Sequence, residues 1–504
     1  LYQNTTGGYN VAIGKDALTS NTTASNNTAV GDSALAANTT GAGNVAVGYG
    51  ALDSNTTANY NTALGYESLS TSTSATGNVA VGFQSMQDNT SGANNAACGY
   101  QALHNNTTAG YNSAVGQNAL GTNTTGQYQT AMGQGALFSS NADHNSAFGV
   151  GAGSAITTGV HNTCIGRNGG SGITTGTNNV TLGNYTINGT ATGGSNIAVG
   201  YAALNQLSTG SNNTALGRDA LLSNTTANNN TAVGYRSGRA TTTGTSNTSM
   251  GTDSLRFCTT GKRNTTIGYN AGQNLTTANN STLIGEGCAG SATTGANNTG
   301  VGRACYEALS TGYNNSAVGE EALEDLTTGN DNIAMGYAAG LLATTGANNV
   351  FLGSFAGSNV TTGTNNILLG QGSQTPNAVD NNQIVLGNSS HSHLRCQVST
   401  ISSLSDERDK TNILDLTEGL NIINLLKPRR FTWAMREESA NNGKTEIGFI
   451  AQELDTVFGD KNDYIKIVDK SNTDKLAVAQ GKLIPILVKA IQELSAEVEL
   501  LKAA

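Results

Sequence analysis

A 17-residue repeat constrains the fold of this chain more than any other feature of the sequence. A glycine that ends triplets such as Ala-Val-Gly recurs at 17-residue intervals from Gly14 to Gly133. One interval of 16 residues leads to Gly149, and the 17-residue interval then holds to Gly387, which makes 23 copies. Because a fixed period of this size is typical of proteins whose repeats stack on one another, the sequence predicts a solenoid over residues 1–390.

The columns of the repeat, meaning the residues at equivalent positions in successive copies, differ in chemistry. The residue before the glycine is apolar in all 23 copies, and the residue two before it is Ala in the first nine. The residue four before it is Asn in 20 copies, with Gln129, Ser281 and Gln383 as the exceptions. Gly, Asn and β-branched residues at this density disfavour a helix. They favour two strands of about four to five residues per copy, joined by tight turns.

Stacking assigns a role to each column. One coil is too small to bury its own apolar column, so successive coils must pack on one another. We expect the Asn side chains to hydrogen-bond in a ladder along the stack. We expect the glycine to stand at a corner that needs a positive φ or a close backbone approach. At roughly 4.8 Å per coil, the stack would form a rod roughly 105 Å long.

The predicted core is thin, and its small Ala residues leave an apolar face on each rod. We expect that face to pack against copies of itself, with three chains around one axis. The "NVAVG" and "AL" columns resemble the head repeats of trimeric autotransporter adhesins, which build a left-handed β-roll, although those repeats are usually a few residues shorter. The resemblance implies a trimeric adhesive or spacer rod, and the left-handedness rests on the resemblance alone.

The composition argues against several classes of partner. A formal net charge of −9 disfavours binding to nucleic acid or to an anionic membrane surface. The chain has no apolar run of 18 residues, so we expect no membrane insertion. It starts at Leu1 without a secretory signal, which indicates a fragment or a processed start. The six cysteines lack metal-type spacing, and Cys98 and Cys164 stand in strand positions where we expect buried free thiols.

The last hundred residues have a different character. Residues 391–404 form a connector, and residues 405–504 contain more charge and the only tryptophan, Trp433. Residues 429–435 are predicted to form a strand, and residues 446–458 a strand that leads into a helix. Near the end, apolar residues alternate in steps of three and four, at Ile484, Leu487, Ile491, Leu494, Val498 and Leu501. This is a heptad pattern, and because it is too short to be stable alone we expect a three-chain coiled coil.

Three motifs in this region, "SDERDKTNI", "IGFIAQEL" and "LIPILVKAIQEL", resemble the intramolecular chaperone auto-processing domain. That domain stands at the C-termini of phage endosialidases, tailspikes and tail fibres, and it also occurs in myelin regulatory factor. The resemblance implies a small trimeric α+β domain, residues 405–504, which templates the preceding β-structure and then cuts itself off. The serine–lysine dyad of that family maps onto Ser405, as nucleophile on the Leu404–Ser405 bond, and Lys410, as its general base.

A lysine acts as a base near neutral pH only when burial lowers its pKa, so cleavage would depend on the assembled trimer. Local sequence alone favours a simpler interpretation, in which Ser405 caps a helix whose first turn is acidic. Asp409 departs from the family, which usually has an apolar residue at that position, and a carboxylate beside Lys410 would tend to keep the lysine charged.

Two further groups of residues are candidates for sites. His391 and His393 lie on one face of an extended segment, and three chains would offer six ring nitrogens to an octahedral transition metal. A plain polar connector is the favoured alternative. One acidic cluster could resemble the carboxylate pair of a glycosidase, but a solvated acidic face is the favoured interpretation. It consists of Glu320, Glu321, Glu324 and Asp325. We expect no cofactor.

These observations predict a phage tail fibre or tailspike that attaches to the host surface. The expected partners are two further copies of the chain, a host-surface glycan or protein receptor, and a tail or baseplate bound through a region before Leu1. The protein would act in the virion tail, outside the cell, after assembly in the host cytoplasm. Its only expected enzymatic activity is that of a single-turnover, self-cleaving serine endopeptidase. The alternatives are a bacterial surface adhesin and a structural extracellular or injection-system fibre with the same chaperone.

Overall fold

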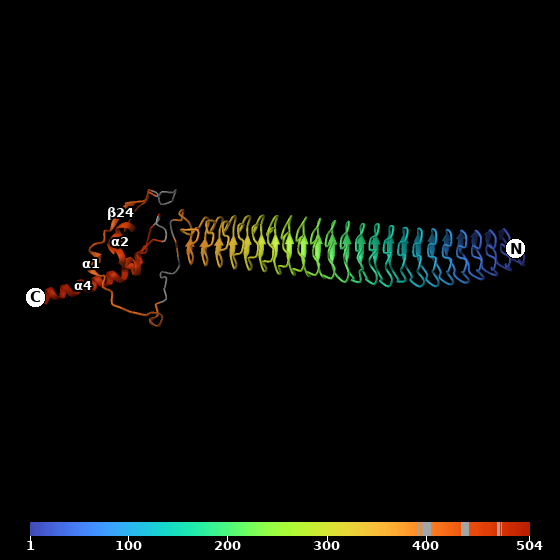
Figure 1. Cartoon of the computed structure of the whole chain (residues 1–504), viewed down its shortest axis with the longest axis horizontal. Helices are drawn as coiled ribbons and strands as arrows, with labels where there is room; N and C mark the ends of the chain where they lie inside the picture. The colour runs from blue at the N-terminus through green and yellow to red at the C-terminus, as the bar shows by residue number, and fades with distance from the viewer. Residues whose placement is uncertain (392–393, 396–404, 435–442, 471–473, 475, 504) are drawn as a thin grey trace.

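A computed structural model describes residues 1–391, 394–395, 405–434, 443–470, 474 and 476–503. Figure 1 shows a long, slender stack of coils that starts at the N-terminus, and a smaller domain with helices at the C-terminal end. Within the described residues the shaft contains 23 short strands, one per coil. They are β1 (Val11–Ile13), β2 (Thr28–Val30), β3 (Val45–Val47), β4 (Thr62–Leu64), β5 (Val79–Val81), β6 (Ala96–Cys98), β7 (Ser113–Val115), β8 (Thr130–Met132), β9 (Ser146–Phe148), β10 (Thr163–Ile165), β11 (Val180–Leu182), β12 (Ile197–Val199), β13 (Thr214–Leu216), β14 (Thr231–Val233), β15 (Thr248–Met250), β16 (Thr265–Ile267), β17 (Thr282–Ile284), β18 (Thr299–Val301), β19 (Ser316–Val318), β20 (Ile333–Met335), β21 (Val350–Leu352), β22 (Ile367–Leu369) and β23 (Ile384–Leu386). The predicted β-solenoid is therefore confirmed.

Each strand pairs in parallel with the strand of the next coil, so that residues one repeat apart lie side by side, as Ala12 does with Ala29. The 16-residue interval does not disturb this register, because Thr130 of β8 still pairs with Ser146 of β9. The shorter repeat lacks one residue in a turn and none in its strand. There the side-chain Oδ1 of Asn141 accepts a hydrogen bond from the N–H of Thr124 at 2.6 Å, where other coils use a backbone carbonyl.

The prediction of two strands per coil is wrong, since each described coil has one strand of three residues followed by turns. The cause is the backbone conformation after the corner glycine. The residues two and four places after it take a positive φ, 57° at Asp16 and 50° at Leu18, which an extended strand does not allow. The coils still hydrogen-bond to one another on this side, for example from the N–H of Leu18 to the carbonyl of Ala34 at 3.1 Å.

The corner glycine behaves as predicted. Gly31 has a φ of 140°, and a Cβ atom at this position would lie 2.4 Å from the carbonyl oxygen of Gly48 in the next coil. A side chain is thus excluded both by the conformation and by the neighbouring backbone. The same two constraints recur from coil to coil, and they explain why the column is invariant within the repeat.

The predicted Asn ladder is present, and much of it runs through the backbone. Asn44 Oδ1 accepts from the N–H of Asn61 at 2.9 Å, and Asn44 Nδ2 donates to the carbonyl of Ala58 at 2.9 Å. A second buried Asn column, which the sequence analysis did not single out, forms direct amide–amide bonds. There Asn38 Nδ2 donates to Asn21 Oδ1 at 3.0 Å, and the pattern repeats in neighbouring coils. Most buried amides in these columns are therefore paired along the stack, and Asn224 is an exception whose amide has no partner among the described residues.

The core is narrow and consists mainly of the Ala two places before the glycine and the Leu four places after it. The residue just before the glycine points outward, because side chains alternate along a strand. Cys98 occupies this outward column and is exposed, so the prediction that it is buried is wrong. Cys164 is one place earlier in its repeat and is buried, and burial raises the pKa of its thiol to about 12.

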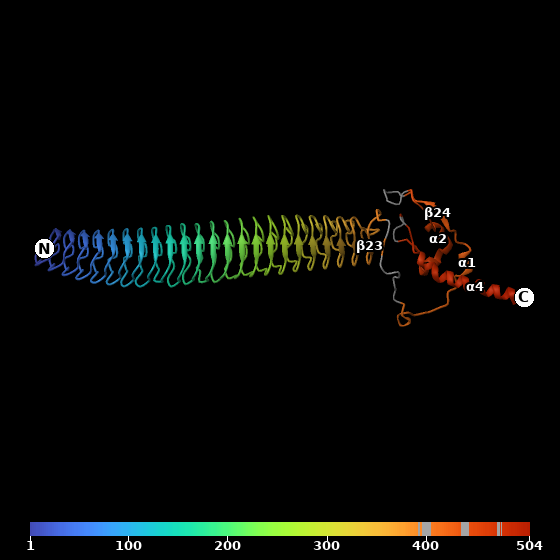
Figure 2. The ribbon, with the colours of Figure 1, turned by 180° about the vertical axis from the view of Figure 1, so that it is seen from behind.

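The C-terminal domain mixes short strands and helices around its own core. Its elements are η1 (Glu407–Asp409), α1 (Leu420–Ile423), β24 (Arg429–Thr432), β25 (Thr445–Gly448), α2 (Ala451–Phe458), η2 (Gly459–Lys461), α3 (Asn462–Ile465), β26 (Val468–Asp469), β27 (Ala477–Val478), η3 (Gln480–Lys482) and α4 (Leu483–Ala503). β24 and β25 pair antiparallel, and β26 pairs antiparallel with β27. Figure 2 shows this domain from the opposite side, with α4 running to the C-terminus. The predicted small α+β domain that ends in a helix is confirmed.

Candidate functional site

Ser405 and Lys410 lie in contact at the start of the C-terminal domain. Lys410 Nζ donates to Ser405 Oγ at 2.5 Å and to the backbone carbonyl of Ser405 at 3.1 Å. The turn between them is the short 3-10 helix η1, which folds the chain back so that residues five apart meet. The residue that caps η1 is Asp406, whose side chain accepts from the N–H of Arg408, so the prediction of Ser405 as the cap is wrong.

Near this pair, the negative charge of Asp406 is neutralised by Arg408 and not by Lys410. Arg408 lies 2.6 Å from the carboxylate of Asp406, and its hydrogen bonds lower the pKa of that carboxyl. Among the residues that the structure describes, Lys410 has no ion pair with Asp409 or any other carboxylate. Both Ser405 and Lys410 are exposed in the single chain. Leu404, the other side of the predicted cleavage site, lies outside the described residues.

A hydroxyl in hydrogen-bond contact with an amine is the minimal arrangement for nucleophilic catalysis by a serine–lysine pair. The amine must be uncharged to accept the hydroxyl proton, and an exposed ammonium in water keeps its proton. The single chain therefore has the contact between nucleophile and base, and it lacks the desolvation that the chemistry requires.

The fold and this pair define a class of protein, a β-solenoid fibre with a small C-terminal domain that follows the shaft. Residues 405–462 match the family described as chaperone of endosialidase. The C-terminal region thus carries a chaperone-of-endosialidase domain, and together with the solenoid it fits a tailspike or fibre that ends in a chaperone. This confirms the predicted resemblance. A search of curated proteins gave no match to the chain.

His391 is exposed at the end of the shaft, and His393 lies outside the described residues. The Nδ1 atom of His391 accepts from the backbone N–H of Asn388 at 3.1 Å, which leaves Nε2 as the nitrogen that faces a metal if one binds. No group of three or more metal-ligating side chains occurs within the described part of one chain. A site shared by three chains stays a prediction.

The acidic residues singled out in the sequence lie on the turn side of one coil, next to Arg303 and Glu307 of the preceding coil. Arg303 Nη2 lies 2.5 Å from Glu320 Oε1 and 3.0 Å from Glu321 Oε1. Burial and the neighbouring carboxylates of Glu321, Glu307 and Asp325 raise the pKa of Glu324. These side chains occupy the stacked turns of the solenoid, where three neighbouring carboxylates repel that of Glu324, as on a solvated acidic face.

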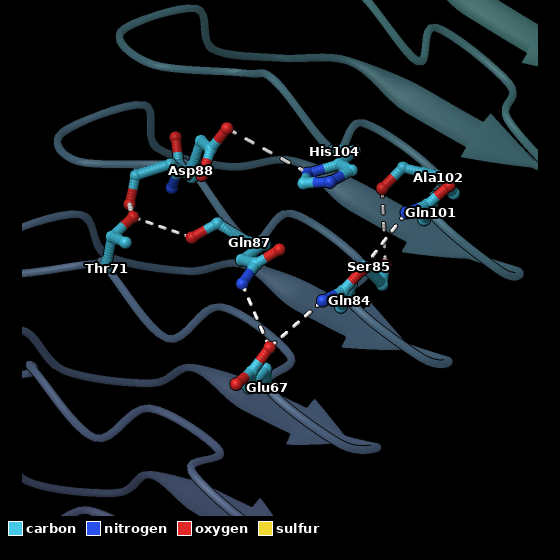
Figure 3. A network of polar contacts seen from close by, with 10 residues as sticks. Glu67, Thr71, Gln84, Ser85, Gln87, Asp88, Gln101, Ala102 and His104 are labelled. Carbon is cyan, nitrogen blue, oxygen red and sulfur yellow. Dashed lines mark hydrogen bonds and ion pairs between the residues drawn. The ribbon is translucent and has the colours of Figure 1, made fainter.

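Polar side chains gather on one side of the coil, which we call the variable face: the positions two and five places after the corner glycine. Figure 3 shows part of it, where Glu67 Oε2 accepts from Gln84 Nε2 and Gln87 Nε2, each at 3.0 Å. Gln101 Nε2 extends this chain of contacts by donating to Gln84 Oε1 at 3.0 Å. Further along the shaft the same two positions carry charged residues. The repeat pattern does not predict this face, because its residues differ from copy to copy.

Apolar side chains stand unpartnered in two places on the single chain. The first is the outer strand face, formed by the residue one place before the corner glycine, where Ile13 is 60% and Leu64 is 47% exposed. The second is the predicted heptad seam of α4, whose six residues are all exposed: Ile484, Leu487, Ile491, Leu494, Val498 and Leu501. Within the described residues, no helix has the length and apolarity needed to cross a lipid bilayer.

Proposed function

We propose that three copies of this chain form a phage tail-fibre or tailspike shaft that attaches to a host surface. The observation that carries the proposal is the continuous apolar stripe of the outer strand face. A monomeric soluble protein rarely exposes an apolar surface that runs along its whole length. Three shafts that turn this face toward a common axis would bury it, and each coil would then contribute to the interface.

The helix α4 supports the same assembly. Its buried residues, Leu483, Ile486 and Ala490, pack into the C-terminal domain, while the heptad seam points away from it. A seam of a and d positions is buried by knobs-into-holes packing against equivalent helices. Because the seam is short, packing in the domain at one end and between chains along its length would act together to stabilise the helix.

We further propose that the chaperone domain cuts the Leu404–Ser405 bond once the trimer has formed. Lys410 takes the Ser405 hydroxyl proton, and Oγ bonds to the carbonyl carbon of Leu404. The carbon–nitrogen bond then breaks, and the Ser405 nitrogen takes the proton from Lys410. Water hydrolyses the resulting ester, which leaves a carboxylate on Leu404 and restores the Ser405 hydroxyl. The neighbouring chains of the trimer would exclude water from Lys410 and so favour its uncharged form.

The shaft would hold the receptor-binding surface away from the particle, in the virion tail and outside the cell. Its partners would be the other two chains, a host-surface glycan or protein, and a tail or baseplate. The trimeric His391 and His393 metal site remains a separate proposal. A bacterial adhesin or an injection-system fibre would use the same shaft and chaperone, and adsorption of the purified trimer to host cells is the property that favours the phage fibre.

The test compares the full chain with Ser405→Ala and Lys410→Gln, and uses Thr411→Ala, a nearby exposed hydroxyl, as the matched control. The wild type and the control should release a fragment that begins at Ser405, as identified by N-terminal sequencing. The two dyad variants should stay intact, and all four proteins should have the mass of a trimer by light scattering. A trimeric wild type that stays intact contradicts self-cleavage alone, and a stable monomer contradicts the whole proposal.

A further inference from the structure

The cations of the shaft are concentrated in a few coils. Residues 1–391 contain nine Lys and Arg, and six of them lie between residues 218 and 263: Arg218, Arg236, Arg239, Arg256, Lys262 and Arg263. Only two acidic residues, Asp219 and Asp253, lie in the same stretch. This part of an otherwise acidic chain therefore has a local net charge of about +4, which attracts anions.

Three of these arginines lie on the variable face, and two of them pair with one carboxylate. Asp253 is 5% exposed, and its Oδ2 lies 2.8 Å from Arg236 Nη2 while its Oδ1 lies 3.5 Å from Arg256 Nε. Arg239 stands one coil before Arg256 at the equivalent position, as the backbone bond from Ala240 N–H to the Arg256 carbonyl shows. We call Arg236, Arg239, Arg256 and Asp253 the arginine cluster, and its net charge is about +2.

The cluster has more donors than acceptors. The Nε–H groups of Arg236, Arg239 and Arg256 are shielded from solvent, and none of them has a hydrogen-bond acceptor within the described residues. Buried donors of this kind are normally satisfied, and each one left without an acceptor destabilises the fold. Among the same described residues, the Oδ1 atom of Asp253 is also buried without a hydrogen bond, because its distance of 3.5 Å from Arg256 Nε is too long to make one. One carboxylate oxygen cannot serve three Nε–H groups, so the cluster keeps donors for a further anionic group.

The stacking of Arg239 on Arg256 adds a second cost. Equivalent positions in adjacent coils lie about 4.8 Å apart, and like charges placed directly side by side on neighbouring strands repel. An anion between the two guanidinium groups would remove this repulsion and accept their hydrogen bonds. Guanidinium forks are well matched to the paired oxygens of a carboxylate, phosphate or sulfate.

Aromatic rings hold two of the guanidinium groups in place. Arg236 lies 4.4 Å above the ring centre of Tyr235, and Arg256 lies 4.7 Å above that of Phe257. Both rings are also partly exposed at the edge of the cluster. Cation–π contacts restrict the long side chains, so less conformational entropy is lost when a ligand binds. The cluster thus combines fixed cations with adjacent apolar surface.

We propose that the arginine cluster binds the anionic group, a carboxylate, phosphate or sulfate, of a host-surface saccharide; the host-surface origin of this ligand rests on the proposed function. A single charged sugar fits the short extent of the cluster. An extended polyanion such as nucleic acid does not fit, because Glu286 and Glu307 occupy the coils that follow and would repel it. The outer strand face, which the trimer would bury, is a different side of the coil from the variable face.

The test uses the assembled full chain and four oligosaccharide probes of equal length, which carry a uronate, a phosphate, a sulfate or no charge. Binding is measured by calorimetry for the wild type and for Arg239→Gln/Arg256→Gln. The matched control is Lys262→Gln/Arg263→Gln, which removes the same charge from exposed positions in the same coils but outside the variable face. At least one anionic probe should bind, and the neutral probe should not.

The cluster variant should lose at least about tenfold in affinity, and the control should lose less than about twofold, because direct contacts outweigh the screened field of distant charges. The preferred probe identifies which of the three anionic groups the site takes. Failure of every anionic probe, or equal weakening in the two variants, overturns the proposal.

Thermal unfolding separates a binding site from a structural cluster. Without ligand the cluster variant should be at least as stable as the wild type, since a like-charge contact is gone, and the anionic probe should raise the unfolding temperature of the wild type only. A less stable variant combined with no effect of the probe on the wild type overturns the proposal. Self-association that weakens with Glu307→Gln/Glu324→Gln also overturns it, because the partner of the arginines would then be a second copy.

Adsorption to host cells distinguishes the two proposals. A cluster variant that no longer binds the probe and no longer adsorbs supports both of them. Unchanged adsorption by that variant overturns the receptor role of the cluster and leaves host attachment in place. A wild type that binds the anionic probe but adsorbs to no host contradicts the proposed function while the anion site stands.

Discussion

The shaft and the C-terminal domain reach stability by opposite arrangements of contacts. In the shaft, a residue pairs with residues one repeat away, as Ala12 pairs with Ala29 and Ala29 with Ala46. In the C-terminal domain, residues far apart in sequence, such as Ile422, Phe458 and Ile486, share one core. The shaft is therefore close to a one-dimensional stack with many similar registers, whereas the domain has one way to pack. On the proposed function, this difference explains why such a fibre would need a domain that sets its starting register.

The two regions also have one property in common, which is an unsatisfied apolar surface on the single chain. On the shaft this surface is the outer strand face, and on the domain it is the heptad seam of α4. A short helical seam can find its partners quickly, because helices associate through local structure. Long-range alignment of 23 coils is slower, so the expected order of assembly is domain first and shaft second.

The largest effect should come from breaking the seam. In Ile491→Asp/Leu494→Asp, six buried carboxylates per trimer would replace apolar contacts, and we expect trimer formation and soluble shaft to be lost. The control is Leu500→Asp, an exposed α4 residue outside the seam, which should assemble normally. Light scattering and electron microscopy report the two outcomes. A normal fibre from the seam variant would show that the shaft aligns without α4.

The next largest effect should come from a corner of the shaft. A Cβ atom at Gly285, which has a φ of 137°, would lie 2.2 Å from the Gly302 carbonyl oxygen. We expect Gly285→Ala to destabilise the neighbouring coils by about 3 kcal/mol. Two residues later, a Cβ atom at Gly287 would have no atom from elsewhere in the described residues within 4 Å, and several other coils have a side chain at the equivalent position. Gly287→Asn should therefore change stability little, as measured by hydrogen exchange of the flanking coils.

A smaller effect tests how one coil departs from the repeat. Gly300 replaces the usual core Ala, and Tyr306 fills the space, so that a Cβ at Gly300 would lie 2.7 Å from Cys288 Sγ and 3.0 Å from Tyr306 Cδ2. We expect Gly300→Ala to cost about 1–3 kcal/mol through overpacking. Gly300→Ala/Tyr306→Leu restores the common pair of the repeat and should recover most of that loss in urea unfolding. Additive losses would contradict this packing relation.

The smallest effect concerns the C-terminal domain. Burial raises the pKa of Glu418, but hydrogen bonds from Tyr464, Thr417 and Lys461 outweigh it, and the pKa is lowered overall. A lowered pKa stabilises the fold above the ordinary value of 4.5, and this contribution disappears as the pH falls through the lower folded value. We expect about 1 kcal/mol from this group. Glu418→Gln should make the stability of the protein depend less on pH below about pH 5.

The control for this group is Glu497→Gln, an exposed carboxylate on α4, which should leave the slope of stability against pH unchanged. A parallel loss of slope in both variants would mean that general charge repulsion, and not the buried contact of Glu418, governs the acid response. Chemical unfolding at a series of pH values, monitored by the fluorescence of Trp433, measures the slope.

The regular part of the structure was predictable from particular residues. The glycine column predicted the corner, and the Asn column predicted the ladder. The positive φ at the corner and the hydrogen bond between coils are required again in each coil, so the same residue type recurs. The resemblance to the chaperone family pointed to Ser405 and Lys410, whose side chains lie 2.5 Å apart, and their catalytic role stays a prediction. The prediction of a second strand in each coil was wrong, because Asp and Leu, the residue types at positions 16 and 18, do not indicate a positive φ. Likewise, the prediction that Cys98 is buried was wrong, because Cys98 lies one strand position away from the buried column. Neighbouring residues of a strand point to opposite faces.

By itself, the sequence determined that the chain contains a solenoid, what its period is, and that a chaperone-type domain follows. Those properties depend on periodicity and on local motifs, which are written along the chain. Only the tertiary structure decided which apolar column is buried, which residue caps η1, and that Arg236 and Arg256 meet at Asp253. These properties depend on how one coil lies over the next, and residues in different coils become neighbours only when the chain has stacked.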